Sequence, residues 1–123
     1  MKALFIATTI LTLILGVSWL FFPQVMLGSW GVAGDAVTVY MSRRYGGLFF
    51  GYVAILWLAR SATPSHTRTA ILVGGTVCSV LMTFVSLLGA LSHVVGPAIW
   101  GAVVVEAVLS VAFVYQLAAD RRA

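Results

Sequence analysis

The sequence predicts an all-α integral membrane protein, a single domain over residues 1–123 that folds as a four-helix bundle. The chain is 62% hydrophobic and only 8% charged, whereas soluble domains carry roughly a quarter charged residues. It also contains four apolar segments of about 19 to 24 residues, and a helix of about 20 residues crosses the hydrocarbon core of a bilayer. We expect membrane-spanning helices at residues 4–22, 36–59, 69–91 and 97–118.

The first apolar segment follows Lys2 and ends before Pro23. A signal peptide also begins with a basic residue, but its apolar region spans about 7–15 residues and is followed by a small-residue cleavage site. Residues 4–22 are longer and lack such a site, so we expect a retained helix. The next segment, 24–34, is rich in glycine, and we expect an interfacial loop there with Trp30 at headgroup level.

The second helix is predicted to begin after Asp35, whose carboxylate can accept hydrogen bonds from the free amides of a new helix. That start places Arg43 and Arg44 roughly 12 Å into the helix, below the headgroups. The alternative, a start at Arg44, would leave both arginines at the membrane surface. Asp35 offers the better cap and a plausible helix length, so we favour residues 36–59.

One face of this second helix combines a charge with two glycines. Because glycine has no side chain, Gly47 and Gly51 would let a neighbouring helix approach the backbone closely. We interpret this GxxxG pattern as packing within the chain, and the alternative is a dimer interface. The residues that share the face at helical spacing are Tyr40, Arg44, Gly47, Gly51, Ala54 and Leu58.

The third helix carries a stripe of small and weakly polar side chains that includes Gly75, Ser79 and Ser86. Small residues allow close contact between membrane helices, so we expect this face to pack inward. The fourth helix is predicted to begin at Gly96 and Pro97, because proline is well tolerated in the first turn of a helix.

Glu106 lies in the fourth helix near the expected centre of the bilayer, where an exposed charge costs at least a few kcal/mol. Three interpretations compete. The carboxylate forms a buried ion pair with Arg44 or Arg43, or serves as a functional proton or cation site, or is a neutral acid hydrogen-bonded to hydroxyl groups of the third helix. We favour the pair of Arg44 with Glu106. Tyr40, Arg43 and Ser110 are further candidates for a polar site in the membrane.

The basic residues predict the orientation of the chain. Five would lie on one side of the membrane, and only Arg43 and Arg44 on the other. Because cytoplasmic segments carry an excess of lysine and arginine, we expect both termini to be cytoplasmic. The five are Lys2, Arg60, Arg68, Arg121 and Arg122.

Several functional classes are disfavoured by the composition. The basic residues form no cluster beyond two, which leaves no surface for nucleic acid. Cys78 is the single cysteine, and no group of His, Cys or carboxylate residues has the spacing of metal ligands. No Ser-His-acid set falls in one membrane layer. We therefore expect no metal, no cofactor and no enzymatic activity, and the predicted partner is the lipid bilayer.

Three short motifs carry a resemblance. Phe22-Pro23 closes the first helix, Arg44 is followed by closely spaced glycines in the second, and Glu106 lies in the last. This arrangement resembles the small four-helix, DoxX-like bacterial membrane proteins of unknown function, over roughly residues 10–117. The resemblance implies a four-helix bundle in a bacterial inner membrane, and it implies no activity.

We accordingly expect a small integral membrane protein that acts as a binding or accessory module, for a small apolar ligand or a partner membrane protein. The alternative is a proton-coupled small-molecule transporter or channel that uses Glu106.

Overall fold

The computed structural model describes residues 1–122 and contains five helices and no strand in that range. The helices are α1 (Lys2–Phe21), α2 (Pro23–Ser29), α3 (Ala36–Ala59), α4 (His66–Leu91) and α5 (Ile99–Arg122). The prediction of an all-α chain is confirmed. Three helices, α1, α4 and α5, are long and apolar enough to cross a membrane, which indicates a membrane protein. Helix α3 has the same length as α5, 24 residues, but contains Arg43 and Arg44.

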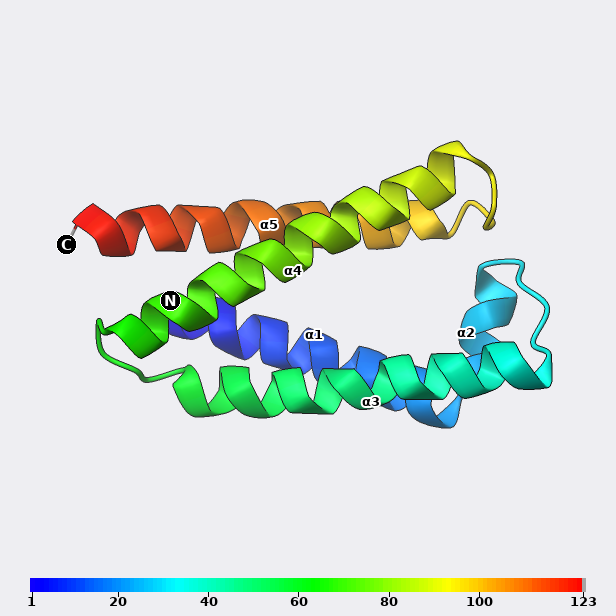
Figure 1. The fold of residues 1–123 in the computed structure, drawn as a ribbon, viewed down its shortest axis with the longest axis horizontal. Helices are drawn as coiled ribbons and strands as arrows, with labels where there is room; N and C mark the ends of the chain where they lie inside the picture. The colour runs from blue at the N-terminus through cyan, green and yellow to red at the C-terminus, as the bar shows by residue number, and fades with distance from the viewer. Residues whose placement is uncertain (123) are drawn as a thin grey trace.

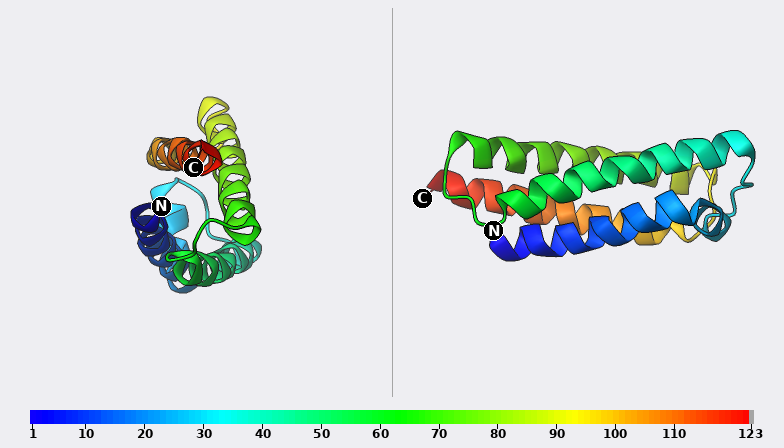
Figure 2. Two further views of the ribbon diagram at one scale, coloured as in Figure 1. Left: turned by 90° about the vertical axis from the view of Figure 1, so that its left-hand side faces the viewer. Right: turned by 90° about the horizontal axis from the view of Figure 1, so that it is seen from below.

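The four long helices form two antiparallel pairs. Helix α1 packs along α3, and α4 packs along α5, while contacts between the two pairs are sparse. Figure 1 shows the pair α4–α5 above the pair α1–α3, and the end-on view on the left of Figure 2 shows the same division. Both termini and the loop between α3 and α4 lie at one end, and the loops on either side of α2 and between α4 and α5 lie at the other.

Polar caps set where α3 and α4 begin. The Thr38 amide donates to the Asp35 carboxylate at 2.7 Å, and the Arg68 amide donates to the Ser65 hydroxyl at 3.2 Å. The predicted start of α3 after Asp35 is confirmed, whereas α4 begins three residues before the predicted position 69. The hydrogen bond from Thr38 also lowers the pKa of the Asp35 carboxyl below its ordinary value, because it stabilises the ionised form.

The predicted loop at 24–34 is partly helical. Pro23 opens α2, since its fixed φ suits the first position of a helix and its missing N–H would be unpaired there in any case. The helix ends at Ser29, and the chain then turns at Gly31, whose φ of +68° lies in the left-handed region that glycine tolerates. The Trp30 carbonyl accepts a hydrogen bond from the Gly96 amide at 2.6 Å, which joins the two helix pairs at this end.

Two apolar clusters hold the pairs together at opposite ends. One cluster contains a buried residue from each long helix and thus joins both pairs near the termini; its members are Phe5, Leu56, Ala59, Leu72 and Phe113. The other cluster consists of Ala90, Ile99 and Val103, with the half-buried Trp30 packed against it. The middle of the molecule lies between these two clusters.

Helix α3 is rotated relative to the sequence prediction. Its buried residues are Ser42, Gly46, Leu56 and Ala59, and every residue of the predicted inward stripe from Tyr40 to Leu58 is exposed. A Cβ added to Gly46 would lie 2.6 Å from the Leu20 amide nitrogen and 2.9 Å from the Trp19 carbonyl carbon. A Cβ at Gly47 or Gly51 would meet nothing within 4 Å. The assignment of Gly47 and Gly51 to packing within the chain is therefore wrong, because the adjacent Gly46 makes the close contact.

Helix α4 buries Gly75, Ser79 and Ser86 on the face that packs against α5. The closest approach involves Gly75, where an added Cβ would lie 2.5 Å from the Phe113 ring. Each serine or threonine hydroxyl on an apolar helix needs a partner, and Ser79 donates to the Gly75 carbonyl of its own helix at 2.8 Å.

Candidate functional site

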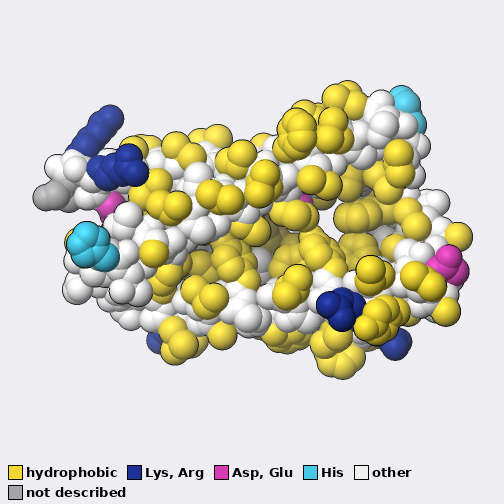
Figure 3. Space-filling view, in the orientation of Figure 1, with side chains coloured by type: hydrophobic (Ala, Val, Ile, Leu, Met, Phe, Trp, Pro, Cys, Tyr) yellow, Lys and Arg dark blue, Asp and Glu magenta, His cyan; other side chains and the backbone are white. Residues whose placement is uncertain are grey.

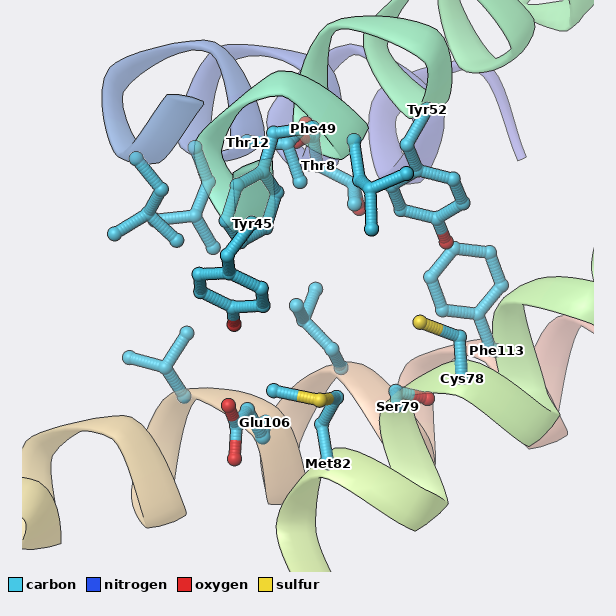
Figure 4. A pocket seen from close by; sticks show the side chains of 15 residues that line it. Thr8, Thr12, Tyr45, Phe49, Tyr52, Cys78, Ser79, Met82, Glu106 and Phe113 are labelled. Carbon is cyan, nitrogen blue, oxygen red and sulfur yellow. The ribbon is translucent and has the colours of Figure 1, made fainter. Parts of the chain in front are cut away.

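A cavity of about 340 Å³ lies between the two helix pairs, in the middle of the molecule. All four long helices contribute to its walls, as Figure 4 shows, and most lining side chains are apolar. Figure 3 shows the molecule hollowed between the pairs, on the face between α3 and α4. The cluster near the termini borders this space, since its member Phe113 also lines the cavity.

Three hydroxyl groups in the cavity wall already donate their hydrogen. Thr8 donates to the Leu4 carbonyl at 2.8 Å, Thr12 to the Thr8 carbonyl at 2.6 Å, and Ser79 to the Gly75 carbonyl. Each oxygen keeps lone pairs, so these side chains can act toward a ligand only as acceptors. These three hydroxyls thus offer the cavity no free donor, and the hydroxyls of Tyr45 and Tyr52 are the ones in the lining that do.

Tyr45 is fixed by aromatic neighbours. Its ring lies 5.7 Å from the Trp19 ring at 77° and 4.8 Å from the Phe49 ring at 71°, which are favourable edge-to-face arrangements. In Figure 4 its hydroxyl points across the cavity toward Glu106 on α5. This hydroxyl makes no hydrogen bond within residues 1–122. The Tyr45 hydroxyl and the Glu106 carboxyl face the same space from opposite walls of the cavity.

Glu106 is the one charged side chain in the lining. It is half-buried, and its Oε2 atom is fully buried with no hydrogen-bond partner in residues 1–122. A polar atom that is buried without a hydrogen-bond partner loses its hydration, and no protein contact replaces it. The cost is about 1–3 kcal/mol for a neutral group and is larger for a charged group. An unsatisfied carboxyl oxygen beside a cavity is therefore the chemical feature that distinguishes this site.

The expected ion pair of Arg44 with Glu106 does not form. Arg44 is exposed on the outer side of the α1–α3 pair, where it lies 5.9 Å from the Tyr40 ring centroid and donates to the Tyr40 hydroxyl at 3.4 Å. Arg43 is exposed as well. This prediction is wrong for the same reason as the glycine assignment: the rotation of α3 turns Arg44 away from α5.

The remaining polar candidates do not gather at one place. Ser110 lies between α4 and α5, where it donates to the Glu106 backbone carbonyl at 2.8 Å and contacts the Thr83 hydroxyl at 3.3 Å. Tyr40 and Arg43 lie on exposed positions of α3. The one ion pair within residues 1–122 joins Arg68 to Asp120 at 2.5 Å, near the chain termini and away from the cavity.

Four polar residues of the lining, Thr8, Thr12, Tyr45 and Tyr52, were not assigned to a polar site from the sequence. Tyr45 was hidden because the predicted inward face of α3 passed through Arg44, one position earlier. Thr8 and Thr12 lie four residues apart and therefore on one face of α1, a spacing that could have indicated them. A metal site is not indicated, since no group of three or more His, Cys, Asp or Glu residues in the described range could hold an ion.

Comparison with known protein families gives a match that covers nearly the whole chain. Residues 1–120 match the family described as "Domain of unknown function (DUF8292)". The chain belongs to this family. The match covers α1 to α4 and α5 up to residue 120, so the DUF8292 unit includes both helix pairs and the cavity between them. Comparisons with curated proteins and with solved structures give no match.

Proposed function

We propose that this DUF8292 protein is a four-helix bundle of the bacterial inner membrane that binds a small apolar molecule in its central cavity. The cavity carries the proposal. Its volume of about 340 Å³ falls within the roughly 300–1,000 Å³ of small-molecule sites, and its lining is mostly apolar. A binding or accessory module needs such a cavity and no catalytic group.

Helix α3 would provide the fourth crossing of the membrane. It runs alongside α1 over its length, and both termini lie at the same end, as an even number of crossings requires. Arg44 bends toward Tyr40, one turn nearer the start of α3, and long basic side chains commonly reach toward headgroups in this way. The basic bias and the DoxX-like resemblance support a cytoplasmic location for both termini.

A ligand would enter from the lipid. The two apolar clusters close the cavity toward both membrane surfaces, whereas contacts between α3 and α4 are sparse. An apolar molecule dissolved in the bilayer could therefore reach the cavity between these helices without crossing water. No histidine lies in the lining, and we propose no catalytic activity.

A second candidate is a proton-coupled transporter or channel, and the free Oε2 of Glu106 favours it. A carboxyl group without a protein partner in a membrane helix is a common carrier of protons or cations. Transport also requires access from both sides, which the end clusters block in this conformation. Binding is therefore the better-supported function.

Saturable binding of tritium-labelled octanol to the protein in phosphatidylcholine nanodiscs tests the proposal, with protein-free nanodiscs as the reference. We expect about one site per chain in the wild type. Cys78→Phe would fill the cavity, because Cys78 lines it, and should weaken binding about tenfold or more. Met82→Trp fills it from another position and should do the same.

Val77→Phe is the matched control. Val77 precedes Cys78 but is 52% exposed and lies outside the lining, so the same added ring should leave octanol binding unchanged. Equal, unsaturable uptake by wild type, Cys78→Phe and protein-free nanodiscs would overturn the proposal.

A further inference from the structure

We infer that the cavity selects an aliphatic ligand that ends in a protonated amine, with the ammonium group held between the Glu106 carboxylate and the Tyr45 hydroxyl. This inference rests on the proposed binding function and names the ligand class of the same cavity. It follows from the polar groups that the cavity presents and from those that it lacks.

The chain supplies no cation for Glu106. No Lys, Arg or His lines the cavity, both arginines of α3 are exposed on that helix, and Arg68 is paired with Asp120. The carboxyl oxygen Oε2 is nonetheless buried and unpartnered. A charge in the membrane interior is costly unless it is paired, so a cationic ligand would gain the interaction that the protein itself does not make.

The uncharged polar groups favour the same ligand. The hydroxyls of Thr8, Thr12 and Ser79 have their hydrogens committed to backbone carbonyls and present lone pairs alone. An ammonium group carries donors and no acceptor, so it complements this wall. A ligand with a carboxylate would find donors in the Tyr45 and Tyr52 hydroxyls, but it would meet Glu106 as a like charge, which disfavours its ionised form.

Aromatic rings strengthen the preference. Tyr45, Phe49 and Tyr52 from α3 and Phe113 from α5 lie in the lining, and ring faces attract cations when water is excluded. An inorganic cation lacks the apolar body that would cover the remaining lining, and no group of three potential metal ligands occurs in residues 1–122. An aliphatic amine combines the charge and the apolar chain.

The experiment compares labelled octylamine, octanol and octanoate, which share one chain and differ in the end group. Binding is measured to wild-type protein and to Glu106→Gln in phosphatidylcholine nanodiscs, whose lipids carry no net charge to concentrate a cation. In the wild type we expect octylamine to bind about tenfold or more tightly than octanol, the usual size of a hydrogen bond to a charged group, and octanoate to bind most weakly.

Glu106→Gln keeps the side-chain shape and should remove most of the advantage of octylamine while leaving octanol within about threefold. Tyr45→Phe keeps the packed ring and should weaken octylamine by a smaller factor, also about threefold. Val77→Phe should change none of the three ligands.

The outcomes separate the two proposals. If octanol binds saturably but octylamine has no advantage, or keeps it in Glu106→Gln, the amine inference is wrong and the binding function stands. If none of the three ligands binds saturably to the wild type, the binding function itself is wrong.

Discussion

The two helix pairs achieve close packing in different ways. In the α1–α3 pair, the backbones themselves meet: a Cβ at Gly46 would lie against the backbone atoms of Trp19 and Leu20, and a Cβ at Gly16 would lie 3.5 Å from the Gly46 carbonyl oxygen. In the α4–α5 pair, Gly75 instead makes room for the ring of Phe113. A contact between backbones fixes the distance between two helices, whereas a contact with a side chain can adjust through rotation and small shifts of that side chain. The α1–α3 pair is therefore the rigid wall of the cavity.

The polar groups follow the same division. Buried threonines on α1 donate to carbonyls of their own helix and leave nothing unpaired. Among residues 1–122, the α4–α5 pair contains the one hydroxyl contact between helices, between Thr83 and Ser110, and the unpaired Glu106 oxygen. The unpaired carboxyl oxygen thus lies on the pair whose close contact is made by a side chain.

The largest expected effect of a single methyl group is at Gly46. Gly46→Ala would place a carbon 2.6 Å from the Leu20 nitrogen and 2.9 Å from the Trp19 carbonyl carbon, and no change of rotamer moves backbone atoms. We expect destabilisation by about 3 kcal/mol, the upper end of the usual range for overpacking, measured by unfolding in a mild detergent. Shortening Leu20 to Ala should not rescue the variant. A rescue would mean that the contact is made by side chains and that the two pairs do not differ.

Gly75→Ala should have a smaller effect, about 1–2 kcal/mol. The added carbon would meet the Phe113 ring, at 2.5 Å, and this ring can shift although it packs against Phe5. Phe113→Leu in the same chain should restore part of the loss, because it removes the atoms in conflict. Unfolding of the single and double variants in the detergent used for Gly46→Ala measures the rescue. If Gly75→Ala proves as harmful as Gly46→Ala and is not rescued, the α4–α5 contact is equally rigid.

The sequence predicted the helices better than their rotation. Apolar length and the Asp35 cap place α3 at residues 36–59, as observed, because these signals are local. Which side of α3 faces inward depends on which of two adjacent glycines touches α1, and neighbouring positions on a helix differ by about 100°. The prediction turned Arg44 inward to pair with Glu106. The structure leaves Arg44 exposed beside Tyr40, an arrangement that avoids burying a guanidinium group.

The cavity, like the rotation of α3, could be predicted from the sequence only in part. Glu106 could be recognised from one acid in an apolar helix, and Ser79 from the small-residue face of the third helix. The cavity also depends on how the two pairs are spaced, which follows from Gly46, Gly75 and the end clusters together. Such a spacing depends on contacts between residues distant in the sequence, and helical periodicity within one segment does not report it.

Gly47→Ala should have the smallest effect, and it is the matched control for Gly46→Ala. The two positions are adjacent in the same helix, so the change in helix propensity is the same, and it favours alanine by up to about 1 kcal/mol. A Cβ at Gly47 meets nothing within 4 Å, so no overpacking opposes that gain. We expect a variant between equal in stability and about 1 kcal/mol more stable than the wild type, with Gly51→Ala behaving alike. Unfolding in the same detergent, at several protein concentrations, measures both. A loss at Gly47 that matches the loss at Gly46 would contradict the observed rotation of α3. A loss seen only at high protein concentration would instead assign the exposed GxxxG face to contact between two copies of the chain, where both glycines could pack closely.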